Sequence, residues 1–201
     1  MPGTAYGHFC PYCTRVMDKR GYIFEKGEFI CEISIDIDFS TKPRIEGSRL
    51  QTEKQIILSH YEQSILWVKG LGELSEEKWR TPFKEGKWSI AEIIGHLIPW
   101  DAFILHNRIP YFFKDVDLPK GPDAQAINDQ AASESRERTK EETIEQFAAT
   151  RQVLLSALED MNDELWTTEL VIGKSVLSLA AYFQGMVEHD NHHFEQIKTV
   201  I

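Results

Sequence analysis

Near the C-terminus, residues 188–197 read EHDNHHFEQI. With a helical period of 3.6 residues, His189 and His193 fall one turn apart on the same face. That face belongs to an apolar stripe whose other members are Leu179, Tyr182, Phe183, Met186, Ile197 and Val200. The stretch therefore predicts a helix that starts near residue 178, runs almost to residue 201, and turns two histidines toward a protein core.

The spacing of these two histidines is typical of ligands that share one metal ion. Imidazoles at i and i+4 of a helix can reach a common ion, and a buried pair needs partners that offset its lost hydration. The alternative is two core histidines hydrogen-bonded to backbone or carboxylate groups. A third histidine, His96, lies in the apolar context IIGHL at 93–97, and facing helices of a bundle commonly build metal sites from such inward positions. His60 and His106 lack this context and are interpreted as surface or partly buried.

Three further long helical patterns precede the C-terminal one, at residues 52–71, 89–108 and 139–158, with a short helical piece at 75–79. The sequences SIAE at 89–92 and TKEE at 139–142 fit capping boxes, in which a hydroxyl and a carboxylate satisfy the unpaired amides of a first helical turn. The pattern predicts a mainly α protein built as a helical bundle.

Two features interrupt these patterns. Residues 114–138 are polar and contain Pro119, Gly121 and Pro122, which indicates a long connection of a kind that is usually functional or partly disordered. Pro99 lies inside the second helix and predicts a kink near His96, because its ring clashes with the preceding turn. Trp100 and Phe103 either line a pocket beside His96 or pack in the core.

The first part of the chain follows a different pattern. Residues 22–24 and 29–35 are β-rich runs on either side of a polar turn at 25–28, which predicts a β-hairpin. Residues 41–48, with Pro43 and Gly47, predict a linker. We therefore expect two parts, a hairpin extension with its linker at 1–45 and a helical unit at 50–201.

Two of the three cysteines belong to the sequence CPYC at 10–13, ahead of this predicted hairpin. Cys10 and Cys13 resemble half of a zinc ribbon, to which Cys31 could add a third thiolate and His8 a fourth ligand. The alternative to this second, structural Zn²⁺ is a reduced thiol pair or a degenerate ribbon. A glutaredoxin motif is less consistent, because no βαβ pattern follows.

The amino-acid composition of the chain argues against some classes of binding partner. Among 201 residues, 32 acidic and 22 basic side chains give a net charge of −10, and because such a surface repels phosphate backbones no nucleic-acid partner is expected. No apolar run approaches the ~20 residues of a membrane span, so no membrane partner is expected. Residues 1–13 lack the basic and apolar regions of a signal peptide, and an odd number of cysteines suits a reducing compartment. Together these features predict a cytoplasmic protein.

Two motifs in the helical unit resemble those of a known family. Residues 81–90 (TPFKEGKWSI), followed by GHL at 95–97, resemble the W-[ST]…H-L segment of the DinB-like/YfiT superfamily. The C-terminal stretch resembles its H-x-x-x-H-x-x-Q/H-I motif, and the resemblance covers about residues 50–201. It implies a four-helix bundle of DinB/YfiT type in which His96, His189 and His193 hold a divalent ion, commonly Zn²⁺ or Ni²⁺.

For function, the resemblance implies metal-dependent hydrolysis or S-transfer of a low-molecular-weight thiol. The expected partner is therefore a small molecule, with a thiol as one candidate, and a homodimer is one candidate assembly. Three histidines leave an open coordination position, which is typical of catalytic zinc. There a bound water reaches a pKa of about 7, or a thiolate binds directly. Spacing singles out none of Glu188, Asp190 and Asp101 as a general base.

Two alternatives come from other functional classes. The first is a non-catalytic metal- or ligand-binding stress-response module that uses the same three histidines. The second is an interaction module in which the zinc-ribbon-like extension recruits a partner and the bundle is inert.

Overall fold

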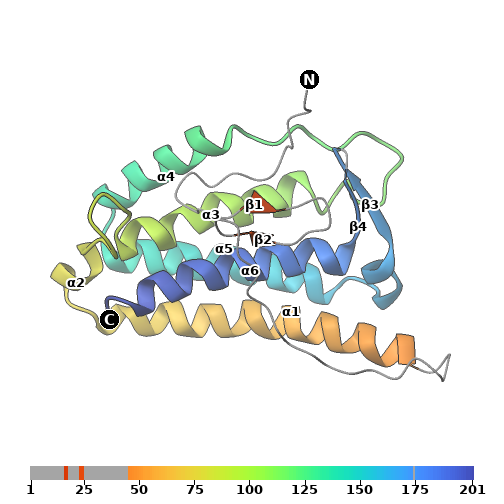
Figure 1. Ribbon diagram of the computed structural model, residues 1–201, viewed down its shortest axis with the longest axis horizontal. Helices are drawn as coiled ribbons and strands as arrows, with labels where there is room; N and C mark the ends of the chain where they lie inside the picture. The colour runs from red at the N-terminus through yellow and green to blue at the C-terminus, as the bar shows by residue number, and fades with distance from the viewer. Residues whose placement is uncertain (1–15, 18–22, 25–44, 174) are drawn as a thin grey trace.

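The computed structural model describes residues 16–17, 23–24, 45–173 and 175–201, and this part of the chain is mainly helical, as the sequence predicts (Figure 1). The helices are α1 (Ile45–Gly70), α2 (Glu76–Arg80), α3 (Ile90–Asn107), α4 (Ala124–Glu137), α5 (Lys140–Glu159) and α6 (Leu179–Lys198). The other described elements are the 3-10 helices η1 (Leu71–Glu73) and η2 (Asp163–Thr167) and the strands β1 (Val16–Met17), β2 (Ile23–Phe24), β3 (Glu169–Ile172) and β4 (Ser175–Ser178).

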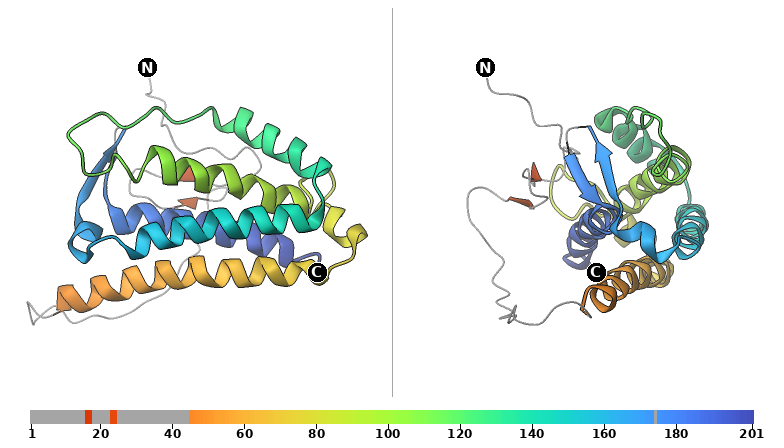
Figure 2. Two further views of the ribbon diagram at one scale, coloured as in Figure 1. Left: turned by 180° about the vertical axis from the view of Figure 1, so that it is seen from behind. Right: turned by 90° about the vertical axis from the view of Figure 1, so that its right-hand side faces the viewer.

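The four long helices α1, α3, α5 and α6 lie side by side around the core (Figures 1 and 2). Helix α3 packs against α5 and α6, and α1 packs against the same two helices. Helix α4 covers the outer side of α3. The antiparallel β3–β4 hairpin precedes α6, and its turn contains Gly173 in the left-handed region at φ 63°.

Among the residues that the structure describes, two clusters of buried apolar side chains make up the core. One includes Trp166 and Phe183, and the other includes Trp79 and Phe147. On α3 the change from one cluster to the other falls between Ile98 and Ile104, and on α6 it falls between Val187 and Phe194. A layer of buried polar side chains, described below, occupies these intervals.

Side-chain caps begin the helices where the sequence predicts. The hydroxyl of Ser89 accepts the amide N–H of Glu92, whose carboxylate accepts the amide N–H of Ser89. Thr139 and Glu142 form the same capping box at the start of α5. Ser178 caps α6 by accepting the amide N–H of Ala181. Each cap satisfies amides that the first helical turn leaves unpaired.

Helix α4 corrects the prediction that residues 114–138 form one long connection. Its buried residues are small or polar, namely Asn128, Ala131, Ala132 and Ser135, so hydropathy gives little sign of a core-facing stripe. Close contact with α3 stabilises it instead. A Cβ added at Gly95 would lie 1.7 Å from Ser135 Oγ, so the two helices approach as closely as they do because residue 95 is glycine.

Two other boundaries differ from the sequence prediction. Helix α1 begins at Ile45 rather than near residue 52, so the predicted linker at 41–48 overlaps a helix. Helix α3 continues through Pro99 to Asn107 without a break in its assignment. The kink at Pro99 stays a prediction.

Near the N-terminus, strand β2 lies within the predicted strand at 22–24 and pairs antiparallel with β1. Its described partner therefore precedes it in the chain. The second predicted strand at 29–35 and the cysteines Cys10, Cys13 and Cys31 lie outside the described residues, so the ribbon-like zinc site stays a prediction. In the described part of the chain, none of the helices combines the length and the apolar character that crossing a membrane requires.

Candidate metal centre

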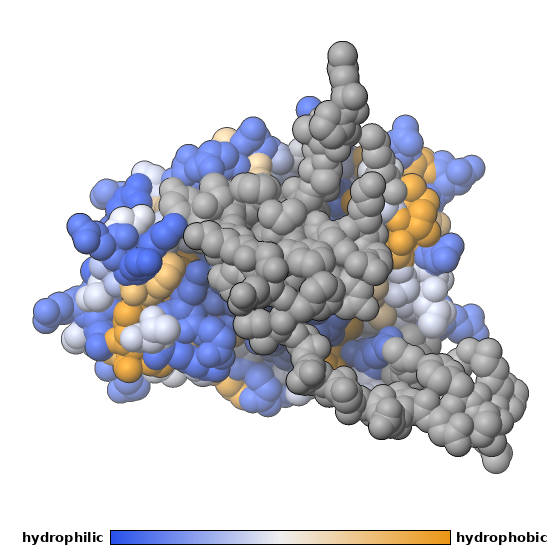
Figure 3. All heavy atoms as spheres, viewed as in Figure 1, coloured by the Kyte–Doolittle hydropathy of each residue, from blue (hydrophilic) through white to orange (hydrophobic). Residues whose placement is uncertain are grey.

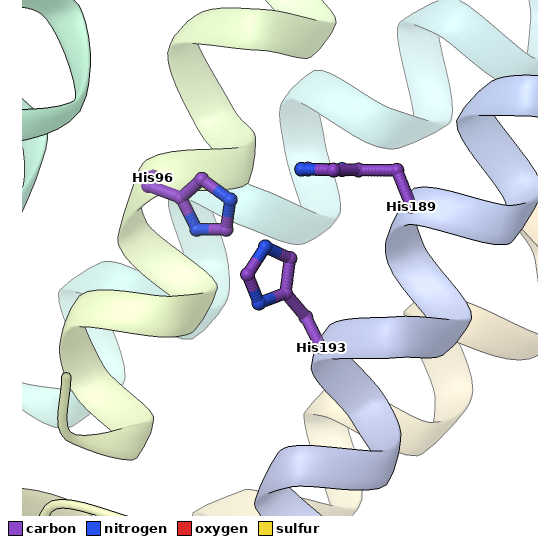
Figure 4. Close-up of side chains that lie close together, drawn as sticks. All are labelled: His96, His189 and His193. Atoms are coloured by element: carbon purple, nitrogen blue, oxygen red, sulfur yellow. The ribbon is translucent and has the colours of Figure 1, made fainter. Parts of the chain in front are cut away.

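Three histidines from two helices meet in the core of the described structure (Figure 4). His96 projects from α3, and His189 and His193 project from α6. Each ring offers one nitrogen as a ligand atom, and these three nitrogens all lie within 4.8 Å of one another. His96 and His193 are fully buried, and His189 is half-buried. The structure thus brings together the three residues that the sequence singled out.

The mutual orientation of the rings follows from their positions on the helices. His189 and His193 are one turn apart, with ring centroids 4.7 Å apart and planes inclined by 83°. The centroid of His96 lies 4.4 Å from that of His193 and 5.5 Å from that of His189. All three pairs are edge-to-face rather than stacked, and Figure 4 shows ring nitrogens turned toward a common space.

A hydrogen bond to the backbone determines which ring nitrogen of neutral His96 carries the proton. Its Nδ1 lies 2.5 Å from the carbonyl oxygen of Ile93, one turn earlier on α3. Because a carbonyl oxygen only accepts, the proton of a neutral His96 resides on Nδ1. The lone pair is then on Nε2, the nitrogen that faces the other two rings in Figure 4.

The aromatic side chain beside this cluster is Trp88, which the sequence analysis did not single out as part of a pocket. Its ring centroid lies 4.8 Å from that of His96 and 6.3 Å from that of His193. The two aromatics considered for that place have other contacts. Trp100 donates its indole N–H to Asn128 of α4 at 2.8 Å, and the ring of Phe103 lies against the guanidinium of Arg108.

A buried ionic network crosses the core next to the histidines. The Arg151 guanidinium on α5 donates two hydrogen bonds to Asp101 of α3, from Nε at 2.7 Å and from Nη2 at 3.0 Å. It also donates from Nη1 to Asp190 of α6. The Nε2 atom of His60, on α1, lies 3.0 Å from the same carboxylate. This network therefore joins α3 to α6, the two helices that carry the histidine cluster.

Burial of the network is nearly complete. The side chains of Arg151, Asp101 and Asp190 are 1%, 4% and 4% exposed. The rings of Tyr61 and Phe147 lie 4.9 Å and 4.7 Å from the guanidinium carbon. Apolar rings and carboxylates together replace the hydration that a buried arginine loses.

The two carboxylates differ in their electrostatic environment. Burial raises the pKa of Asp101 to about 6, although the Arg151 guanidinium opposes that change. For Asp190, burial also favours the protonated acid, but Arg151 and His60 together outweigh it and hold the pKa below its ordinary value. His60 donates to Asp190 or interacts with its charge in addition to Arg151, so the pKa of Asp190 falls where that of Asp101 rises.

Sequence analysis named Asp101 and Asp190 without a role and did not identify Arg151. One sequence feature does point to it. Arg151 occupies a core position in the apolar stripe of α5, whose other members are Ile144, Phe147, Leu154 and Leu158. A charged residue on such a stripe requires a buried partner.

The other histidines in the described part of the chain have distinct environments. His106 is exposed on α3, as expected, and His60 is half-buried and bonded to the ionic network. His192 is half-buried on α6, where its Nε2 lies 2.9 Å from the side-chain nitrogen of Gln196.

The donor set fits a divalent ion. With bonds of about 2.0–2.1 Å, two nitrogens bound to one Zn²⁺ lie at most about 4 Å apart. The observed limit of 4.8 Å therefore requires only small side-chain rotations before the three imidazoles can share one centre. Neutral imidazole suits Zn²⁺ and Ni²⁺, and three protein ligands leave at least one coordination position for a water or a substrate.

Structural comparison finds similar folds at low sequence identity. YfiT from Bacillus subtilis, described as "a probable metal-dependent hydrolase with an unusual four-helix bundle topology", is 12% identical with a TM-score of 0.57, over 84% of this chain and 93% of that one. A mycothiol-dependent maleylpyruvate isomerase is 14% identical with a TM-score of 0.52, over 74% of this chain and 59% of that one. These likenesses concern the fold alone.

Sequence comparison identifies the family. Comparison with curated protein sequences gives no match. The family model described as the DinB superfamily matches residues 66–197, a segment that contains all three histidines. Because this match spans more than half of the sequence, the chain belongs to the DinB superfamily.

Proposed function

We propose that this chain is a DinB-type four-helix bundle in which His96, His189 and His193 bind one divalent metal ion, Zn²⁺ or Ni²⁺. The ion serves hydrolysis of a small substrate or S-transfer of a low-molecular-weight thiol. One observation carries the proposal, namely three imidazoles from two packed helices with nitrogens within 4.8 Å of one another. The fold likeness to YfiT, whose description names a metal-dependent hydrolase, supports the same interpretation.

The three histidines differ in their roles. His96 and His193 are fully buried and hold the ion from the core side, whereas the half-buried His189 marks the side from which a small molecule arrives. A divalent ion bound there supplies Lewis-acid activation of a water or a thiol. Trp88 covers the cluster beside His96 and excludes water from that side. The Asp101–Arg151–Asp190 network keeps α3 and α6 at a fixed separation.

Metal content tests the binding site. In a chain with Cys10, Cys13 and Cys31 replaced by serine, we expect about one divalent ion per chain by elemental analysis. His96→Ala, His189→Ala or His193→Ala should remove it, while His106→Ala, which changes an exposed histidine of α3, should retain it. Because imidazoles must be neutral to ligate, protons compete with the ion, and zinc affinity should also fall when the pH is lowered from 8 to 5. Unchanged metal content in all three variants would show that these histidines do not bind the ion.

Turnover separates the enzyme from a non-catalytic binding module. The metal-loaded chain is assayed with panels of small esters and amides, and with thiol–electrophile pairs. We expect turnover that His189→Ala abolishes and His106→Ala preserves. Metal binding without turnover across both panels would favour the non-catalytic module.

The cysteines support a separate proposal, a structural Zn²⁺ held by Cys10, Cys13 and Cys31. The intact chain should then contain one more zinc than the cysteine-to-serine variant. Equal zinc content in the two proteins would contradict this second site.

A further inference from the structure

The side chain of Gln196 lies between two imidazoles on α6. Its Oε1 is 2.8 Å from His193 Nδ1, and its Nε2 is 2.9 Å from His192 Nε2. The amide is thus in contact with both rings, at positions i−3 and i−4 of one helix. Gln196 and His192 are not members of the three-histidine cluster, whereas His193 is, so the amide contacts the cluster through the ring of His193.

The chemistry of the amide determines where the protons reside. An amide oxygen only accepts, so the Nδ1 atom of His193 donates and carries its ring proton. An amide nitrogen only donates, so the Nε2 atom of His192 accepts. In this arrangement His193 is left with its lone pair on Nε2. Figure 4 shows that the ring nitrogen of His193 farther from its Cβ points into the space between His96 and His189.

The opposite arrangement would block coordination. If the side-chain amide of Gln196 were flipped by 180°, its nitrogen would donate to His193 Nδ1. The proton of the His193 ring would then reside on Nε2. The nitrogen that faces His96 and His189 would then have no lone pair for an ion. The amide orientation therefore distinguishes a ligating tautomer of His193 from a non-ligating one.

We propose that Gln196 is a positioning residue that holds His193 in the Nδ1–H tautomer and so directs the Nε2 lone pair toward His96 and His189. The effect of Gln196 on metal binding rests on the function proposed above, whereas its effect on the tautomer of His193 does not. His96 obtains the same tautomer from the carbonyl of Ile93, which no substitution can remove. Gln196 performs this task with a side chain, and its effect can therefore be tested by substitution.

Three variants test the proposal in the full-length chain. Gln196→Met has a similar length but accepts no strong hydrogen bond, Gln196→Glu keeps an oxygen acceptor, and Gln184→Met changes an exposed glutamine of the same helix. In metal-free protein at pH 8, nitrogen-15 NMR of the histidine side chains reports the tautomer of His193. We expect Nδ1–H in the parent chain, Gln196→Glu and Gln184→Met, and a shift toward Nε2–H in Gln196→Met.

Zinc affinity, measured by competition with a chelator, provides the second readout. Loss of a hydrogen-bond partner behind a ligating histidine typically weakens metal binding by about 10–100-fold, so we expect that loss in Gln196→Met. Gln196→Glu should bind within a few-fold of the parent chain, which would show that the loss follows from the missing acceptor and not from any replacement of residue 196. Gln184→Met should match the parent.

The outcomes keep the two proposals distinguishable. A parent chain in which His193 carries its proton on Nε2, or a Gln196→Met variant with unchanged tautomer, would overturn the role of Gln196. A changed tautomer with unchanged zinc affinity would overturn its role for the metal. If the parent chain binds no zinc, the proposed metal function fails, and the NMR result alone still decides whether Gln196 sets the tautomer.

Discussion

At the scale of single residues, Gly95 has a different role from the one its neighbours in the sequence suggest. It lies four residues before Pro99, whose ring clashes with the carbonyl of residue 95, and this position points to relief of strain at the proline. In the structure it allows close contact between two helices, since a Cβ there would meet Ser135 Oγ at 1.7 Å and Ser135 Cβ at 2.8 Å. Contacts this short require a shift of the backbone rather than a rotation of one side chain.

We therefore expect Gly95→Ala to destabilise the protein, although alanine is the better helix former by about 1 kcal/mol. Overpacking of a tight contact costs about 1–3 kcal/mol, which offsets that gain at its lower end and outweighs it over the rest of the range. Chemical denaturation of the parent and variant measures the difference. Ser135→Gly in the Gly95→Ala background removes both clashing atoms, so it should recover stability relative to Gly95→Ala. Gly95→Ala that is as stable as the parent would contradict the packing role.

At the scale of elements, the helix starts depend on capping residues that act locally. The carboxylate of Glu142 accepts the amide N–H of Thr139 at 2.9 Å. This hydrogen bond from the backbone amide, together with the one from the Thr139 side chain, lowers the pKa of Glu142 from its ordinary value of 4.5. The ionised carboxylate is therefore part of the cap that begins α5.

The stability that this carboxylate contributes should depend on pH. Because its pKa is lower in the folded than in the unfolded chain, the contribution is present above pH 4.5 and is lost as the pH falls through the folded-state value. Denaturation midpoints at pH 6 and pH 3.5 should show the parent more stable than Glu142→Gln at the higher pH, with a smaller difference at the lower. The control Glu145→Gln removes an exposed carboxylate of the same helix outside the cap. The same pH trend in that control would show that the capping box is not its source.

At the scale of the whole molecule, four helices meet at one buried arginine. Arg151 on α5 bonds to Asp101 on α3 and to Asp190 on α6, and Asp190 also bonds to His60 on α1. This polar layer lies between the two apolar clusters described above, next to the histidines. The carboxylates raise the pKa of Arg151 further although burial opposes the charge, so the arginine stays cationic in the core.

We expect Arg151→Met to cost about 3–5 kcal/mol of folding stability, because it leaves two buried carboxylates without their cation. The control Lys198→Met breaks an exposed pair with Glu195, 52% and 71% exposed, and should cost at most about 1 kcal/mol. Equilibrium unfolding in denaturant measures both. Equal small losses in the two variants would show that the network contributes little to the fold.

Much of the architecture could be predicted from the sequence because its determinants are local. A capping box needs residues three apart, and a helical stripe needs a period of 3.6, so the starts of α3, α5 and α6 agree with the prediction. The i, i+4 spacing of His189 and His193, and the apolar surroundings of His96, likewise appear within single segments. These signals named the three histidines, and the fold brings them together.

What the sequence by itself could not determine depends on contacts between segments. Helix α4 has a polar sequence with only a few small buried residues. These residues can pack closely against α3 only because Gly95, which has no side chain, lies opposite them. The bonds of Arg151 to Asp101 and Asp190 join residues 50 and 39 positions apart, and no periodicity within one helix encodes such a pairing. Local patterns determine which face of a helix is buried, but only tertiary packing decides which side chains meet there, because that depends on how separate helices are placed against one another.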